Sequence, residues 1–411
     1  MIDTGNTAWI TMSTILVMFM TIPALALFYG GLVRSKNILS VLMQCLICTA
    51  VGSVLWIGIG YSWVFGTNLQ GTPLGFFIGG YDKVFLHGVT IHSIIAGPNI
   101  PEITYVLFQC MFAVITPALI IGAFAERLRF PSFLLFTVLW SIFVYYPMAH
   151  FVWGGGWLQK LGAIDFAGGT VVHINAGISA LIMALLLGKR ADYKPNRPIP
   201  AQNVPFVFMG AAMLWLGWFG FNAGSGLTAG GLDANAFLVT HIATCAAAIV
   251  WMAIDWFCND KPTTVGMCTG AVAGLVAITP AAGSVDVFGA ICIGSITSVI
   301  CYFMVAVVKR YFGYDDALDA FGVHGMGGIV GSILTGVFAT KIVTGGPCGA
   351  MEGNWHQLGI QILATLFSII YSSVITFVLY KVIDRIIGMR VELREEEEGL
   401  DVYEHSESAY N

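Results

Sequence analysis

Two histidines, His173 and His324, lie in the middle of long apolar stretches, in the segments GGTVVHINAG and FGVHGMGG. An ionisable group inside such a stretch is a functional candidate, and histidine exchanges protons near neutral pH. Glycines surround both residues and let helices approach closely, so the two rings could meet across a helix pair. The alternative is two unrelated buried histidines, each satisfied by a backbone carbonyl.

Aromatic residues and one serine form a second candidate group. They are Phe112, Trp153 in the segment WGGGW, and Trp218, Phe221 and Ser225 in WFGFNAGS. Aromatic faces attract cations, and rings combined with a hydroxyl acceptor suit a small hydrogen-bonding cation. The alternative is that these tryptophans belong to an interfacial belt and the phenylalanines to a core.

Two aspartates precede the histidine segments, Asp165 in GAIDFAGG and Asp319 just ahead of FGVHG. A carboxylate at the edge of an apolar stretch either orients a site or caps the following helix. We expect a role in the site for Asp165. Both interpretations stay open for Asp319.

The composition indicates where these residues must be held. Hydrophobic residues make up 57% of the chain and charged residues only 10%, whereas a soluble domain is about one quarter charged. Repeated apolar runs of about 18 residues or more predict an all-α integral membrane protein. Eleven transmembrane helices are expected near residues 8–32, 39–65, 102–125, 131–150, 170–188, 203–223, 234–258, 264–282, 285–310, 321–340 and 357–387.

The basic residues predict the orientation. Fifteen follow odd-numbered helices: Arg34, Lys36, Arg127, Arg129, Lys189, Arg190, Lys194, Arg197, Lys261, Lys309, Arg310, Lys381, Arg385, Arg390 and Arg394. Only Lys83, Lys160 and Lys341 lie on the other side, which predicts a cytoplasmic C-terminus and an outside N-terminus in the cell (plasma) membrane. With Asp3 ahead of the first apolar run, and no basic residue there, we expect no cleaved signal peptide.

Matching features recur five helices apart. Ile-Thr-Pro stands at residues 115–117 and again at 278–280, in the third and eighth helices. The fifth and tenth helices carry His173 and His324, with Asp165 and Asp319 upstream. Because five is odd, this spacing predicts two five-helix halves in inverted orientation, with a site at their interface.

Several function classes are disfavoured. No HExxH or GxSxG motif accompanies the histidines, so we expect no enzyme and no intramembrane hydrolase. No basic stripe is present that would bind nucleic acid. The nine cysteines fall mostly inside apolar runs and are interpreted as packing residues, and we expect no metal or cofactor site.

Several segments now identify a resemblance. They are LFQCMFAVITPALIIGAFAERLRF, AHFVWGGGWL, GAIDFAGGTVVHINAG, GWFGFNAGSGLTA, GLVAITPAAG and FGVHGMGGIVG. They resemble, in order and across almost the whole chain, those of the ammonium transporter (Amt/Mep/Rh) family. The resemblance implies an eleven-helix bundle with an inverted five-plus-five repeat, a homotrimer with one pore in each subunit, and a role in nitrogen uptake.

The resemblance also implies a recruitment site at the outer mouth of the pore. Trp153, Phe112 and Ser225 match the family's outer ammonium site, and Asp165 lies close beneath it. Trp153 resembles the Amt branch more than the Rh branch.

Deeper in the pore, five positions match the family pattern. Phe112 and Phe221 resemble a stacked phenylalanine gate, and Trp218 matches a residue that lines the pore. His173 and His324 resemble twin histidines that share a hydrogen bond in the lumen.

The chain divides into a transmembrane domain, residues 1–388, and a C-terminal tail, residues 389–411. The tail is polar and acidic, and by composition alone it is expected to be solvated and flexible. Its GLD segment and following residues nevertheless resemble the family's cytoplasmic regulatory region. That region packs under neighbouring subunits and binds a PII-type signalling protein.

We therefore predict a transporter for ammonium, with methylammonium as an analogue. Moving a bare cation into a low-dielectric medium costs tens of kcal/mol, and a cation-π contact returns only about 2 kcal/mol. Ammonium is expected to give up its proton, so that ammonia passes neutral histidines. The alternatives are an ammonium sensor that signals through the tail and a neutral channel for water or another gas.

Overall fold

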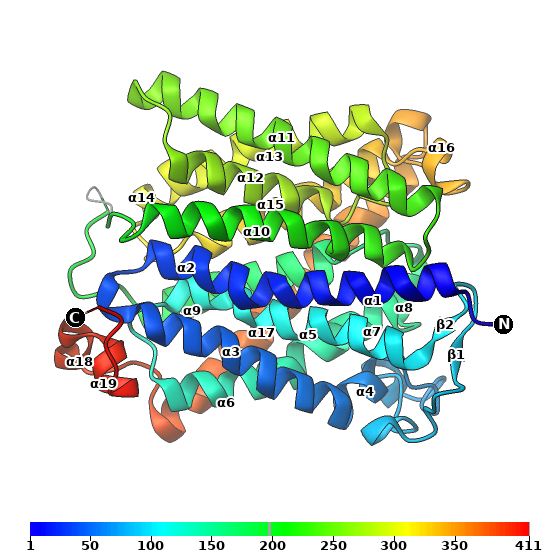
Figure 1. The fold of residues 1–411 in the computed structure, drawn as a ribbon, viewed down its shortest axis with the longest axis horizontal. Helices are drawn as coiled ribbons and strands as arrows, with labels where there is room; N and C mark the ends of the chain where they lie inside the picture. Colours follow the sequence, from blue (N-terminus) through cyan, green and yellow to red (C-terminus); the bar gives the residue numbers. More distant parts are fainter. Residues whose placement is uncertain (196–198, 411) are drawn as a thin grey trace.

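The computed structural model of the protein describes residues 1–195 and 199–410. Long helices lie roughly along one axis and form a bundle, and the two termini emerge at opposite ends (Figure 1). We call these the N-terminal end and the C-terminal end. Arg197 and Asn411 lie outside the described residues. Arg197 is one of the basic residues that predict the orientation.

Within the described residues, eleven apolar helical spans cross the bundle. Ten are long and apolar enough to cross a membrane, and the 15-residue α12 is a shorter eleventh. Spans 1 to 5 are α1 (Thr4–Phe19), η1 (Met20–Leu25) and α2 (Ala26–Leu32); α3 (Ile38–Leu55), η3 (Trp56–Gly60) and α4 (Tyr61–Phe65); α5 (Glu102–Phe124); α6 (Phe130–Trp140), η6 (Ser141–Tyr145) and α7 (Tyr146–Trp153); η7 (Gly169–Ile174) and α9 (Asn175–Leu187). Spans 6 to 11 are α10 (Val204–Ala223); α11 (Gly231–Asn259); α12 (Thr264–Ile278); α13 (Val287–Phe303), η9 (Met304–Val308) and α14 (Lys309–Phe312); η10 (Phe321–Gly325) and α15 (Met326–Phe338); α17 (Trp355–Ile387). The predicted all-α membrane fold is confirmed, with helix boundaries shifted by a few residues.

Short elements connect the spans. At the N-terminal end lie α8 (Trp157–Leu161), α16 (Lys341–Thr344) and a two-stranded antiparallel sheet of β1 (Ile94–Ile95) and β2 (Ile100–Pro101), in which Ile95 pairs with Ile100. The 3-10 turns are η2 (Ser35–Asn37), η4 (Leu74–Phe76), η5 (Val84–Leu86), η8 (Gly224–Gly226) and η11 (Ala350–Glu352). After span 11 the tail forms α18 (Leu393–Glu398) and α19 (Leu400–His405).

Span 3 forms the centre of the N-terminal half. Every residue from Cys110 to Phe124 is buried, and α5 packs against α1, α3 and α9. By contrast, α11, α13 and α17 expose many apolar side chains on their outer faces. Such a surface is stable in hydrocarbon and unfavourable in water, as expected for helices that face lipid or another subunit.

Buried ion pairs hold the connections at the C-terminal end. Glu126, between spans 3 and 4, contacts Arg34 at 2.7 Å and Arg190 at 2.8 Å, and Arg190 also contacts Asp315 at 2.9 Å. Burial would raise the pKa of Glu126, but Arg190 and Arg34 hold it below its ordinary value. This network joins the connections that follow spans 1, 3, 5 and 9.

The tail folds back onto the C-terminal end of the bundle (Figure 1), so the flexible end expected from composition is wrong. The Asp401 carboxylate accepts from the Ser40 backbone N–H at 2.8 Å, and the Leu400 N–H donates to the Asn37 side-chain oxygen at 2.9 Å. Leu400 is fully buried. The tail therefore caps the first turn of α3. The positive end of the helix dipole also stabilises the Asp401 carboxylate there.

We expect Asp401→Ala to release the tail, because it removes the acceptor for an orphan N–H of α3. The loss should be about 1 kcal/mol in the free energy of unfolding. Tryptic cleavage after Arg394 measures tail release, with Glu397→Ala as control because its side chain is exposed. Equal cleavage rates in the two variants would show that Asp401 does not hold the tail.

Candidate functional site

His173 and His324 meet in the middle of the bundle. Their ring centroids lie 5.4 Å apart with an interplanar angle of 14°, and both side chains are almost fully buried. Glycine makes this approach possible, because a Cβ atom on Gly177 would lie 2.1 Å from the Gly325 backbone nitrogen. Spans 5 and 10 therefore touch backbone to backbone, as their glycines predicted.

Three of the four ring nitrogens of the histidine pair are buried without a hydrogen-bond partner in the part of the chain that the structure describes. Neither ring nitrogen of His173, and not Nδ1 of His324, has a hydrogen-bond partner within residues 1–195 and 199–410. The mutual hydrogen bond expected from the resemblance is therefore not formed in this structure. Buried polar atoms normally have partners, so these nitrogens are available to a small hydrogen-bonding guest.

Aromatic rings continue from His173 toward the N-terminal end. Trp218 stacks on His173 at 5.4 Å between centroids, and Phe221 lies 6.1 Å from the same ring. Phe221 stacks on Phe112 at 4.4 Å, and Trp153 contacts Phe112 edge-on at 5.7 Å. Spans 3, 4, 5 and 6 thus bring together five of the predicted residues in one continuous row.

Trp153 and Ser225 lie at that end of the row which faces the N-terminal end of the bundle. The Trp153 indole N–H donates to the backbone oxygen of Asp165 at 2.9 Å, which fixes the ring beside Phe112. Ser225 follows α10 and is partly exposed, and its hydroxyl donates to the Phe221 backbone oxygen at 2.8 Å. One hydroxyl lone pair is left to accept from a guest.

The Asp165 carboxylate accepts hydrogen bonds from the first residues of span 5 and the residue before them. Its oxygens accept from the backbone N–H groups of Gly168 at 2.8 Å, Gly169 at 2.5 Å and Thr170 at 2.8 Å, and from the Thr170 hydroxyl. These bonds satisfy orphan donors at a helix start, which is the capping role. Asp165 therefore acts on the site by holding η7 and Trp153 in place.

The counterpart of Asp165 in the second half is Asp316, so the expected pairing with Asp319 is wrong. Asp316 accepts from the backbone N–H groups of Ala320 at 3.0 Å and Phe321 at 2.8 Å and so caps η10. Asp319 instead pairs with Lys309 at 2.6 Å. Burial raises the pKa of Asp316 to about 7, Lys309 opposes this shift, and Asp319 adds to it.

The two caps support the inverted repeat. Asp165 begins span 5 at the N-terminal end and Asp316 begins span 10 at the C-terminal end, and each acid stands eight residues before its histidine. Each span opens with a π-helical turn, η7 or η10, that carries the histidine. The halves therefore direct their histidines to one point from opposite ends.

A small cavity lies between the histidines and Phe221. Its volume is about 10 Å³, roughly the room for one water-sized molecule. Its apolar lining is Met20, Leu25, Phe28, Ile115, Leu119, Val172, Leu214, Phe221 and Val272. Trp218 also lines it, but its indole N–H is engaged by Thr279 at 2.9 Å, so only the two histidines offer free polar atoms.

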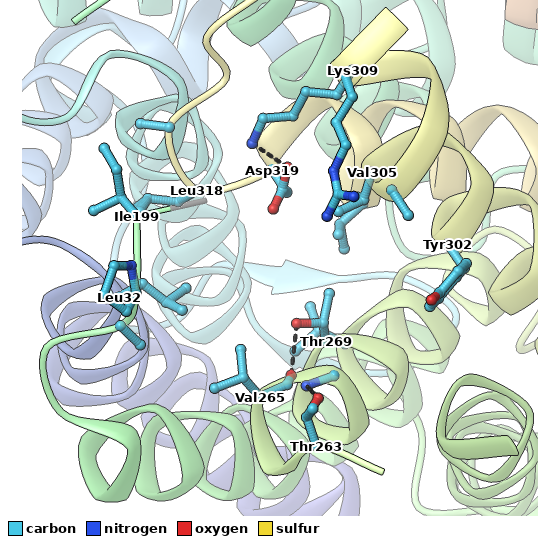
Figure 2. Close-up of a pocket in the computed structure, with 18 of the residues that line it drawn as sticks. Leu32, Ile199, Thr263, Val265, Thr269, Tyr302, Val305, Lys309, Leu318 and Asp319 are labelled. Atoms are coloured by element: carbon cyan, nitrogen blue, oxygen red, sulfur yellow. Dashed lines mark hydrogen bonds and ion pairs between the residues drawn. The ribbon is translucent and has the colours of Figure 1, made fainter. Parts of the chain in front are cut away.

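A larger cavity of about 650 Å³ opens from His324 toward the C-terminal end. Figure 2 shows the Lys309–Asp319 ion pair on one wall, with Thr263, Val265 and Thr269 opposite and Tyr302 to one side. This vestibule is wide and has charged and hydroxyl groups among its apolar lining residues, whereas the cavity between Phe221 and the histidines is narrow and mainly apolar. Within the described residues, no group of three or more His, Cys, Asp or Glu side chains is placed to hold a metal ion.

Eleven apolar spans around a row of aromatic rings and histidines, with a vestibule at one end, define a multi-pass membrane protein of the transporter class. The model of the Ammonium Transporter Family matches residues 8–410. A curated relative, an ammonium transporter of Aquifex aeolicus, is 51% identical over 410 residues and covers 100% of this chain and 94% of its own. The chain belongs to the ammonium transporter family.

Solved structures agree with this assignment. The crystal structure of Candida albicans Mep2 superposes with a TM-score of 0.88 at 36% identity, covering 96% of this chain and 88% of that chain. A structure described as a sensor Amt protein superposes with a TM-score of 0.89 at 30% identity, covering 98% of both chains.

Sequence reasoning missed three contributors to the site. Asp316 was overlooked because Asp319 is also acidic, although the common spacing of eight residues to the histidine would have identified it. Thr279 belongs to the Ile-Thr-Pro repeat, but its hydrogen bond to Trp218 could not be predicted without knowing how spans 6 and 8 pack. The π-helical turns have no simple sequence pattern.

We expect Asp165→Asn to destabilise the protein by about 1–2 kcal/mol, because an amide nitrogen replaces one capping oxygen. As a positioning residue it should lower the maximal rate of methylammonium uptake and leave the half-saturating concentration within about twofold of the parent. Asp82→Asn, in the exposed loop at the same end, is the control. A higher half-saturating concentration with an unchanged maximal rate would instead indicate that Asp165 contacts the cation directly.

Proposed function

We propose that the chain carries ammonium across the cell membrane through a path in each subunit. Its N-terminal end faces outside, its C-terminal end faces the cytoplasm, and three copies assemble as a homotrimer surrounded by membrane lipid. The observation that carries this proposal is the pair of unpartnered buried histidines in an apolar cavity of about one water volume.

Recruitment takes place at the outer end of the aromatic row. Ammonium lies against Trp153 and Phe112 and donates to the Ser225 hydroxyl, while Asp165 holds the Trp153 ring through its backbone oxygen. Each desolvated ring contact is worth about 2 kcal/mol. That attraction concentrates the cation but is too weak to carry it inward.

Passage requires loss of the proton. The cavity beyond the stacked Phe112 and Phe221 gate cannot replace the hydration of a cation, whose transfer costs tens of kcal/mol. Ammonia is neutral, and it fits the room beside Trp218 and can bond to the nitrogens of His173 and His324. The proton that ammonium gives up is relayed separately along His173, His324 and water to the vestibule, where it protonates ammonia again, so that one charge crosses with each ammonia. Potassium is excluded because it has no proton to lose.

At the cytoplasmic face, the tail offers a regulatory surface. Residues 389–410 are folded, and the exposed outer faces of α18 and α19 lie beside the vestibule end of the bundle. We propose that a PII-type signalling protein binds there.

Methylammonium uptake tests the transport proposal. The purified chain in liposomes should accumulate radiolabelled methylammonium faster than empty liposomes, and unlabelled ammonium should compete. Absence of uptake by an intact, folded protein would overturn transport and leave an ammonium sensor as the function.

The histidine pair generates a prediction about selectivity. His173→Ala or His324→Ala should reduce ammonium current or admit potassium, because the widened cavity becomes hydrated. We expect the preference for ammonium over potassium to change by about tenfold or more, which corresponds to about 1.4 kcal/mol.

Currents across supported liposome membranes measure this preference. His241→Ala is the control, because His241 is exposed on the outer face of α11 and packs beside Trp215. If both pore variants matched this control in current size and ammonium preference, the histidines would have only a packing role.

The stacked phenylalanines generate a second prediction. Phe221→Ala should alter methylammonium flux without unfolding the protein, because the ring borders a cavity on one side. Its cost should fall below the about 3–5 kcal/mol usual for a core phenylalanine. Phe219→Ala is the control, since Phe219 stacks on Phe237 at 3.9 Å, away from the path. An intact trimer with unaltered flux and selectivity would remove the gate assignment.

A further inference from the structure

Span 11 lies beside span 5 in fixed register. Three of its side chains contact span 5 or the residue before Asp165: Gln361 bonds to Ile164, Ser372 to Asn175 and Thr376 to Ser179. Each pair is separated by 197 residues in the chain. A constant separation means that the two segments run parallel without slipping.

The outer contact supports the start of span 5. The Gln361 side-chain amide accepts from the Ile164 backbone N–H and donates to the Ile164 oxygen, both at 2.7 Å. It also donates to the Ser332 backbone oxygen on span 10 at 3.1 Å. One buried amide therefore links spans 5, 10 and 11 directly ahead of the Asp165 cap.

The middle contact acts on the π-helical turn that carries His173. The Asn175 backbone N–H donates to the Thr170 and Val172 oxygens and skips the Val171 oxygen. The Asn175 side-chain amide donates to that Val171 oxygen at 3.2 Å. The side chain thus completes the hydrogen bonding of a turn whose backbone is out of α-helical register.

Ser372 fixes the orientation of the Asn175 amide. Its hydroxyl donates to Asn175 Oδ1 at 2.6 Å, and both residues are fully buried. With Oδ1 held by Ser372, the amide nitrogen must point toward Val171. Without the Ser372 hydroxyl, the buried Asn175 Oδ1 has no donor. The side-chain amide of Asn175 is then no longer held with its nitrogen toward Val171.

We propose that Ser372 is a positioning residue for the transport site: through the Asn175 amide, it holds the π-helical turn that directs His173 toward His324. Ser372 touches neither histidine nor the small cavity. This role rests on the proposed transport function, because the turn matters to transport only if the guest passes His173.

Ser372→Ala tests the role, with Ser368→Ala as the matched control. Ser368 is buried on the same helix, four residues earlier, but its hydroxyl donates to the Ala364 oxygen of its own helix and contacts the Met148 sulfur of span 4 at 3.6 Å, not span 5. We expect Ser372→Ala to lower methylammonium uptake by about tenfold, as small misplacements of site residues do. Ser372→Thr keeps a hydroxyl donor and should restore uptake.

Amide hydrogen exchange in residues 169–176 provides a readout that does not depend on transport. Ser372→Ala should accelerate exchange there relative to Ser368→Ala, and Ser372→Thr should return it to the parent rate. Equal exchange and equal uptake in the two alanine variants would overturn the proposal.

The two failures are distinguishable. If the parent protein transports nothing, the proposed function fails, while the exchange measurement still tests whether Ser372 holds the turn. If the parent transports and Ser372→Ala alters exchange but not uptake, the turn does not position the site and the proposal is likewise overturned.

Discussion

The close crossing of spans 5 and 10 determines the rest of the structure. At Gly177 and Gly325 the two helix backbones are so close that a Cβ atom added to Gly177 would collide with the backbone of Gly325. Only this approach allows His173 and His324 to lie side by side, and only capped helix starts allow both spans to reach the crossing with their hydrogen bonds satisfied. Asp165 and Asp316 supply these caps at opposite ends of the bundle.

Because of this crossing, the proposed path is divided into three unlike parts. In the proposed function, the row of rings attracts a cation, the short space beside the histidines accepts a small neutral molecule, and the vestibule returns that molecule to water. Each part uses a different physical property, namely ring quadrupoles, exclusion of water and solvation. We propose that two cations of similar size are distinguished at the middle part by whether they can give up a proton.

Much of this arrangement could be predicted from the sequence. Apolar length identified the eleven spans, and the offset of five between Ile-Thr-Pro segments and between histidines predicted the repeat. Local patterns could not distinguish Asp316 from Asp319, because both lie in the same short acidic loop and only the backbone shows which one caps η10. Composition alone also missed the folded tail, although the resemblance implied a packed region, because the tail is held by bonds to Asn37 and Ser40, more than 350 residues earlier in the chain.

We propose that the space between Phe221 and the histidines admits a neutral molecule and excludes an intact cation. Potassium current tests it most directly, in liposomes that hold the unmodified protein and are supplied with potassium or ammonium at equal concentration. We expect ammonium transport with no potassium current above that of empty liposomes. A potassium current comparable to that of ammonium, abolished by unfolding the protein, would contradict it.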